Sequence, residues 1–178
     1  APALPLEELM ASDHSLASFA DFLGREPLAA QPGTRWIYGY STDILARVLE
    51  IVSGQQFDCF LRERIFAPLG MEDTFFRVPD DKAGRLAVLY RLEADGTLST
   101  LDGNGPEALF RRDKPFLSAS AGLVSSPADY LRFCTMLLNR GTLDGVAILG
   151  SKTVELMTMD HLPAEHPNLE IFNQCFRF

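Results

Sequence analysis

Residues Pro32 to Gly54 read "PGTRWIYGYSTDILARVLEIVSG" and combine a turn, an aromatic extended segment and a helix. The Pro-Gly pair favours a turn, and the extended aromatic segment follows it. Ser41 or Thr42 can then cap a helix. Apolar residues recur in that helix at intervals of three and four, so they should share one face. These residues are Ile44, Leu45, Val48, Ile51 and Val52. Gly54 is expected to end the helix in the left-handed conformation.

The composition predicts a globular chain without affinity for polyanions. Its 178 residues are 47% hydrophobic, enough for the core of one domain. The formal charge of −8 argues against a nucleic acid or an anionic membrane as partner. Apolar runs are far shorter than the roughly 20 residues that cross a bilayer. The first ten residues lack signal-peptide features, and the compartment stays open between cytoplasm and periplasm.

Cysteines and histidines give no metal-binding pattern. Cys59, Cys134 and Cys175 are odd in number and widely spaced, which favours buried free thiols over a disulfide or a nucleophile. His161 and His166 stand five apart and do not share a helix face, so we expect no zinc site.

Periodicity predicts further helices and hairpins around the opening stretch. Two short helices are expected between Pro5 and Leu23. Another helix, from Phe57 to Phe66, should form a helical hairpin with the helix that ends at Gly54. Strand-like runs in residues 87–101 meet at Asp95-Gly96, a strong hairpin signal.

The C-terminal half contains the same kind of pattern as the opening stretch, a loop followed by a capped helix. Ser126 should cap a helix with Pro127 in its first position, and Ser151 should cap a last helix that ends near Met159. The apolar tail, residues 168–178, suits a strand that needs neighbours. No repeat or linker divides the chain.

Four stretches together resemble the serine β-lactamase and penicillin-binding-protein superfamily, in the branch of class C β-lactamases and family VIII esterases. They are "PGTRWIYGYSTDILARVLEIVSG", "FLRERIFAPLGMEDTFF", "FLSASAGLVSSPADYLRFCTMLLNRG" and "LDGVAILGSKTVELM", in the family's order, from Gln31 to Met159. The resemblance implies a mainly α chain with short β-hairpins, the helical lobe of the α/β serine β-lactamase/transpeptidase-like fold. Residues 1–178 would then be a single partial domain.

The resemblance also implies acyl transfer to a serine. In this family an S-x-x-K helix supplies the nucleophile and a lysine, a tyrosine motif supplies a phenol, and a K-T-G or H-T-G strand lines the substrate site. Tyr38 falls at the position of the catalytic phenol, and Tyr40, Ser120 and Ala121 at substrate-binding positions. A tyrosine with its ordinary pKa near 10 is a poor base at pH 7, so Tyr38 needs a nearby lysine. Without a nearby lysine, Tyr38 would serve only as an aromatic packing residue. No metal or organic cofactor is implied.

The chain departs from the family in the residues that it lacks. None of its three lysines, Lys82, Lys114 and Lys152, follows a serine at the S-x-x-K spacing. Lys152 begins a K-T-V sequence that resembles K-T-G but lacks the glycine and suits a helix surface. No G-x-S-x-G is present either. We therefore expect the serine and the K-T-G strand outside residues 1–178, and the chain alone to be inactive.

Smaller departures concern the substrate. Tyr40 stands where the family motif has an asparagine, which suits the esterase branch better than β-lactams. The Cβ atoms of Ser120 and Ala121 replace glycines and should narrow backbone access to the acyl pocket. Asp43 suits a first-turn helix charge better than an acid catalyst.

The sequence thus predicts part of a serine hydrolase that acts on short-acyl esters or amides, with β-lactams less favoured. Its partners would be these small molecules and the missing part of its own fold. The alternative is a non-catalytic helical module that docks on another polypeptide. A peptidase or an acyltransferase with the same residues cannot be separated from an esterase by sequence, because pocket shape selects the leaving group and the acceptor.

Overall fold

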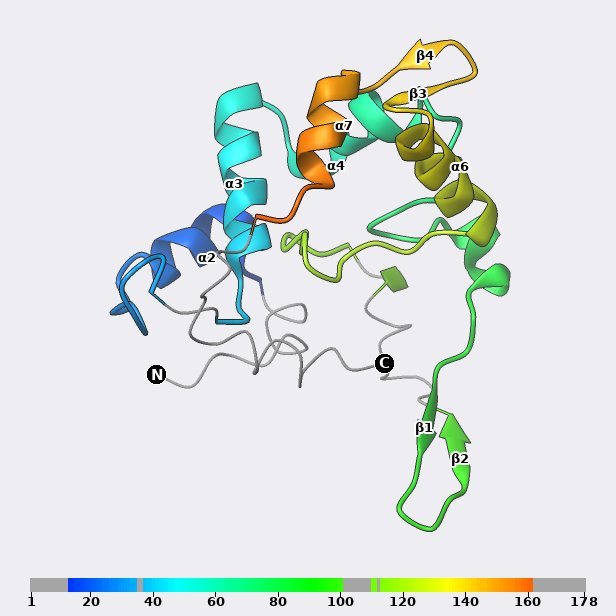
Figure 1. The fold of residues 1–178 in the computed structure, drawn as a ribbon. Helices are drawn as coiled ribbons and strands as arrows, with labels where there is room; N and C mark the ends of the chain where they lie inside the picture. The colour runs from blue at the N-terminus through cyan, green and yellow to red at the C-terminus, as the bar shows by residue number, and fades with distance from the viewer. Residues whose placement is uncertain (1–12, 35–36, 101–109, 112, 162–178) are drawn as a thin grey trace.

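The computed structural model describes residues 13–34, 37–100, 110–111 and 113–161, and helices dominate them (Figure 1). The α-helices are α2 (Leu16–Leu23), α3 (Ser41–Ser53), α4 (Phe57–Leu61), α6 (Pro127–Leu138) and α7 (Ser151–Met157). Two further helical segments differ from the α-helix in their winding: the wider π-helix η1 (Arg62–Phe66) and the tighter 3₁₀-helix η2 (Asp80–Arg85). The strands form two antiparallel pairs, β1 (Tyr90–Leu92) with β2 (Leu98–Thr100) and β3 (Thr142–Leu143) with β4 (Val146–Ala147). Within these ranges, no helix has the length and apolarity to cross a membrane.

The predicted start of α6 is confirmed, and the second of the two short helices predicted between Pro5 and Leu23 is present as α2. Ser126 caps α6 by accepting a hydrogen bond from the backbone N–H of Asp129 at 3.2 Å, with Pro127 in the first helical position. Helix α2 begins with a capping box, in which Ser15 accepts from the backbone N–H of Ser18 and the Ser18 hydroxyl accepts from that of Ser15. The helix predicted before α2 lies outside the described residues.

The predicted caps of α3 and α7 are wrong by one or two positions. Tyr40 and Gly150 are the N-caps, and neither makes a side-chain capping bond. Ser41 and Ser151 are instead the first helical residues. The left-handed end of α3 is confirmed, because Gly54 has φ of 69°.

The predicted helix from Phe57 to Phe66 is continuous but changes its winding at Arg62. The N–H of Ala67 donates to the carbonyl of Arg62 at 2.8 Å, five residues back, as in a π-turn. The hairpin around Asp95-Gly96 is also confirmed, with Tyr90 opposite Thr100 and Leu92 opposite Leu98. Residues 168–178 lie outside the described part.

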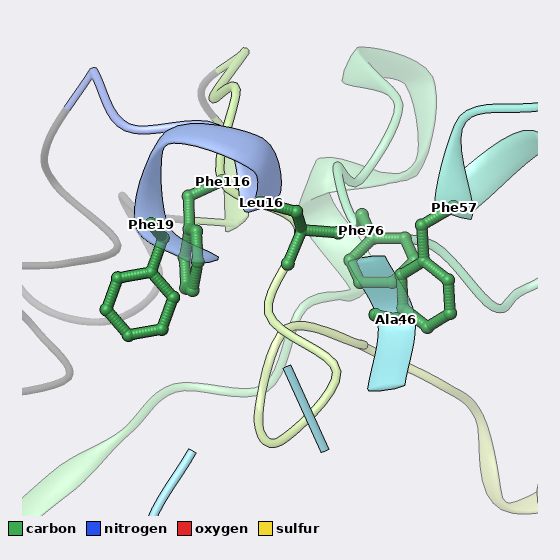
Figure 2. Packing of buried hydrophobic residues seen from close by; sticks show 6 residues of the cluster. All are labelled: Leu16, Phe19, Ala46, Phe57, Phe76 and Phe116. Carbon is green, nitrogen blue, oxygen red and sulfur yellow. The ribbon is translucent and has the colours of Figure 1, made fainter. Parts of the chain in front are cut away.

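The core joins α2, α3 and α4 to two loop segments. Its buried members are Leu16, Phe19, Ala46, Phe57, Phe76 and Phe116 (Figure 2). The rings of Phe19 and Phe116 meet nearly at right angles with centroids 5.2 Å apart, an arrangement that aromatic pairs favour. A second cluster, Phe66, Leu69, Met71 and Met136, lies between η1 and α6. Phe76 and Phe116 therefore hold two loops against the helices.

Helix α3 has two sides that differ in their surroundings. Ala46 faces the core, whereas Leu45 and Val52 are 58% and 80% exposed. Val48 and Ile51 are exposed as well. The apolar positions that the sequence places on one face are therefore mostly turned away from the described chain, because only the Ala46 side has neighbours to pack against.

Candidate functional site

The two tyrosines before α3 differ in how they are held. Tyr38 lies in the segment leading to the helix, and 76% of its surface is exposed. Tyr40 is half-buried, and its ring meets that of Phe19 edge-on, with centroids 5.1 Å apart and an interplanar angle of 88°. Tyr40 thus anchors the entry to α3 in the core, and Tyr38, two residues earlier, presents its ring at the surface.

The first turn of α3 is tied to the loop at residues 118–121 by one carboxylate. Asp43 is 1% exposed, and its Oδ1 accepts hydrogen bonds from Ser118 Oγ at 3.0 Å and from the Ala119 N–H at 2.8 Å. Ser120 Oγ donates to Oδ2 at 2.5 Å. A buried carboxylate is costly unless it is hydrogen-bonded, and the positive end of the helix dipole favours it here as well. Loop and helix start therefore form one rigid unit.

Further hydrogen bonds shape the loop itself. Ser118 Oγ accepts from the backbone N–H groups of Ser120 and Ala121, both at 3.2 Å. The hydroxyls of Thr42 and Ser120 lie 2.7 Å apart. The Gly122 N–H donates to the Ser118 carbonyl at 2.9 Å and closes the turn. Ser120 and Ala121 remain at the surface, each in a defined position.

Helix α6 is also joined to a distant loop by a buried aspartate in its first turn. Asp129, like Asp43, occupies the third position of its helix, and its carboxylate accepts from the Asp73 N–H at 2.7 Å and from Thr74 Oγ1 at 2.9 Å. The Asp73 side chain pairs with Lys82 and Arg85, each at 2.7 Å. Hydrogen bonds from these two cations, Arg85 first, lower the pKa of Asp73 to about 2. The aspartates in the first turns of α3 and α6 thus each bind a loop that is distant in sequence.

The structure brings together part of the predicted site. Ser120 is bonded to the first turn of α3, which begins three residues after Tyr38, and Ala121 lies beside Ser120 in the same turn. Asp43 does carry a first-turn charge, as predicted, but its role as the anchor of this loop was missed. The available signal was the small polar sequence "SASAG" together with an aspartate in the third position of both helices.

Lys152 and the thiols lie apart from these residues. Lys152 is in the first turn of α7, and its amine pairs with Glu155 at 2.6 Å, as expected for a helix surface. Cys59 and Cys134 are free thiols, but the prediction of burial is wrong for Cys134, which is exposed, and Cys59 is only partly buried. Cys175 lies outside the described residues.

The histidines do not form a metal site with the residues that the structure describes. His161 Nε2 lies 2.6 Å from the carbonyl oxygen of Leu156, and His166 falls outside the described part. Across the described ranges, no three His, Cys, Asp or Glu side chains gather as metal ligands.

Comparisons with known proteins identify the relatives of this chain. The family model described as "Beta-lactamase" matches residues 2–168. "Protein Rv1367c" of Mycobacterium tuberculosis is 38% identical over 139 residues, which are 78% of this chain and 34% of that protein. Monacolin J acid methylbutanoyltransferase of Aspergillus terreus is 35% identical over 147 residues, 81% of this chain and 33% of that protein. The chain thus spans about a third of these curated relatives.

Solved structures show the same likeness. Unliganded simvastatin synthase (LovD) from Aspergillus terreus, as the selenomethionyl derivative, superposes with a TM-score of 0.70 at 30% identity, over 98% of this chain and 42% of that one. "EstCE1, a hydrolase with promiscuous acyltransferase activity" superposes with a TM-score of 0.74 at 24% identity, over 89% of this chain and 43% of that one. The EstCE1 match shows the fold alone.

Proposed function

Because the chain belongs to the beta-lactamase family, we propose that it is the helical lobe, a single partial domain, of a serine hydrolase or acyltransferase acting on short-acyl esters or amides. The names of its relatives support acyl transfer, since one is a methylbutanoyltransferase and another an esterase. The observation that carries the proposal is Tyr38, exposed next to a helix start that Asp43 holds rigidly.

The proposed reaction has two steps. A serine hydroxyl attacks the substrate carbonyl, and the bond to the leaving alcohol or amine breaks to give an acyl-enzyme. Water or an acceptor alcohol then attacks the acyl carbon and releases the serine. Tyr38, with a lysine beside it, takes the proton of the attacking hydroxyl and returns one to the leaving group. We assign the serine and the lysine to polypeptide outside residues 1–178.

The loop at residues 118–121 supplies one wall of the proposed acyl pocket. The Ser120 hydroxyl is already bonded to Asp43 and Thr42, so we propose that Ser120 contributes shape. Ala121 adds a Cβ atom to the same wall. Tyr40, held by Phe19, forms a fixed side of the pocket, which favours small acyl groups.

Steady-state kinetics of the full-length protein with p-nitrophenyl butyrate tests the role of Tyr38. Tyr38→Phe should lower kcat about 100-fold or more with little change in KM, the usual loss when a general acid-base group is removed. Tyr130→Phe is the control, because Tyr130 is an exposed tyrosine on α6. Full activity of Tyr38→Phe would contradict the assignment. Residues 1–178 alone should be inactive.

The exposed side of α3 favours a second function, docking. Leu45, Val48 and Val52 follow one another along the helix and face away from the described core. About two thirds of each relative's length lies outside the part that this chain matches. We propose that an apolar helix from that remainder of the same protein packs on these three side chains. Their burial would stabilise the contact by about 1.5–3 kcal/mol per side chain.

Complementation between two separately produced pieces tests this docking. Residues 1–178 should bind the remainder of the full-length protein, and Val48→Asp should abolish binding without altering the folded state. Leu28→Asp is the matched control, because Leu28 is exposed but lies outside α3. Equal binding by both variants would exclude the α3 surface. Turnover by residues 1–178 alone would exclude a purely non-catalytic docking module.

A further inference from the structure

The structure contains an open cleft of about 790 Å³, and Tyr38 is not among the residues that line it. It is bounded by α4 and η1, by residues 70–77 and by residues 113–117. Its apolar lining includes Phe66, Met71, Phe75 and Leu117. The volume lies in the range of small-molecule sites, which are mostly apolar with a few polar groups.

Lys114 lines this cleft and differs from the other two lysines. Lys82 pairs with Asp73 at 2.7 Å and Lys152 with Glu155 at 2.6 Å. The Nζ of Lys114 is buried and finds no hydrogen-bond acceptor in the part of the chain that the structure describes. It lies 4.9 Å from the centre of the Phe110 ring. A cation over a ring gains some electrostatic energy, but three N–H donors still lack an acceptor.

The buried amine is costly for the isolated chain. Burial lowers the pKa of Lys114 to about 8, so the amine still carries its charge through much of the neutral range. A buried donor without an acceptor loses the hydrogen bonds that it makes with water. A ligand oxygen at this position would restore one of them and neutralise the charge.

The other charges of the cleft restrict the ligand class. Arg77 pairs with Asp113 at 3.2 Å, and Arg62, which also lines the cleft, donates to the Cys59 thiol at 3.6 Å. The acidic residues Asp58 and Glu72 belong to the lining as well. These acidic groups would repel a ligand with several negative charges. One carboxylate on an apolar body matches a single unpaired amine beside an apolar floor.

We propose that this cleft binds an apolar monocarboxylate, whose carboxylate accepts hydrogen bonds from Lys114 Nζ while its hydrocarbon part packs on Phe66, Met71 and Phe75. The site does not depend on the proposed acyl transfer. It is nevertheless connected to the loop that Asp43 holds, because residues 113–117 lead directly into Ser118. Occupancy should therefore also restrain that loop.

Calorimetric titration of the chain with octanoate tests the proposal, with octanol as the uncharged probe of equal length. Octanoate should bind more tightly than octanol. Lys114→Met should weaken octanoate binding at least tenfold and leave octanol binding nearly unchanged. Lys152→Met is the control for a general loss of positive charge and should bind octanoate as the wild type does.

A spectroscopic measurement identifies the amine directly. Because the chain has three lysines, reductive ¹³C-methylation gives one NMR signal for each lysine beside that of the N-terminal amine. Octanoate should shift the signal that disappears in Lys114→Met and should raise the pKa of that amine. An unshifted Lys114 signal, or equal octanoate affinity of Lys114→Met and wild type, would overturn the proposal.

Discussion

Asp43 and Ser120 are joined by a hydrogen bond of 2.5 Å from the serine hydroxyl to the carboxylate, across 77 positions of sequence. The same carboxylate accepts from Ser118 and from the Ala119 N–H. The helix start that follows Tyr38 and the loop proposed to line the acyl pocket are therefore positioned by one buried side chain.

Asp43→Ala should destabilise the chain by about 2–4 kcal/mol, because the Ser118 hydroxyl and the Ala119 N–H lose their acceptor inside the protein. Urea unfolding followed by circular dichroism measures the change. Asp21→Ala is the matched control, because Asp21 is an exposed aspartate on α2, and should shift stability by less than about 0.5 kcal/mol. Equal effects of the two substitutions would show that the Asp43 contacts contribute little.

Gly122→Ala should destabilise the turn at residues 118–121. A Cβ atom on Gly122 would lie 2.3 Å from the Ser118 carbonyl oxygen and 2.9 Å from the Phe76 ring. Backbone cannot move aside as a flexible side chain does, so we expect a loss of about 1–3 kcal/mol or more. Gly84→Ala is the control, since its added Cβ would meet no atom within 4 Å. Thermal unfolding of the two variants would separate strain from a general glycine effect.

The two tyrosines before α3 should differ in their contribution to stability. Tyr40→Ala removes the edge-on contact with Phe19 and should cost about 2–4 kcal/mol. Tyr38→Ala removes a mostly exposed ring and should cost less than about 1 kcal/mol. Guanidinium unfolding compares them. A reversed order would mean that Tyr38, not Tyr40, anchors the helix entry.

Stability should fall in acid as Asp73 becomes protonated. The pKa of this carboxyl is lowered from 3.8 to about 2 in the folded chain, so the unfolded chain takes up the proton first. The stabilisation is complete above about pH 4 and is lost as the pH falls toward 2. Asp73→Asn should therefore be less stable than wild type at pH 6 and nearly equal to it near pH 2. A gap that persists unchanged at pH 2 would contradict this assignment.

Lys114 should affect the free energy of unfolding at alkaline pH, whereas Asp73 affects it in acid. Its pKa is lowered from 10.5 to about 8 in the folded chain, so the folded chain releases this proton first as the pH rises. Stability associated with Lys114 should increase between about pH 8 and pH 10.5. Lys114→Met should raise stability at pH 7 and remove this increase. Unfolding at a series of pH values with Lys152→Met as control tests both effects.

Local signals in the sequence were sufficient for most elements. Ser126-Pro127 located the start of α6, Gly54 the end of α3, and Asp95-Gly96 the hairpin of β1 and β2, because each depends on backbone preferences of adjacent residues. The caps of α3 and α7 were misplaced because a serine near a helix start does not show whether its hydroxyl turns toward the backbone. The roles of Tyr38, Tyr40, Ser120 and Ala121 in catalysis and binding stay predictions.

The sequence by itself determined the family, the order of the helices and hairpins, and the position of Tyr38 before α3. Only the tertiary structure decided that Asp43 holds the loop of Ser118 and Ser120, that Tyr40 packs on Phe19, and that Lys114 is buried without an acceptor in the described chain. Helix periods and turn preferences are set by neighbours in sequence. Burial and long-range hydrogen bonds are set by residues that meet only when the chain has folded.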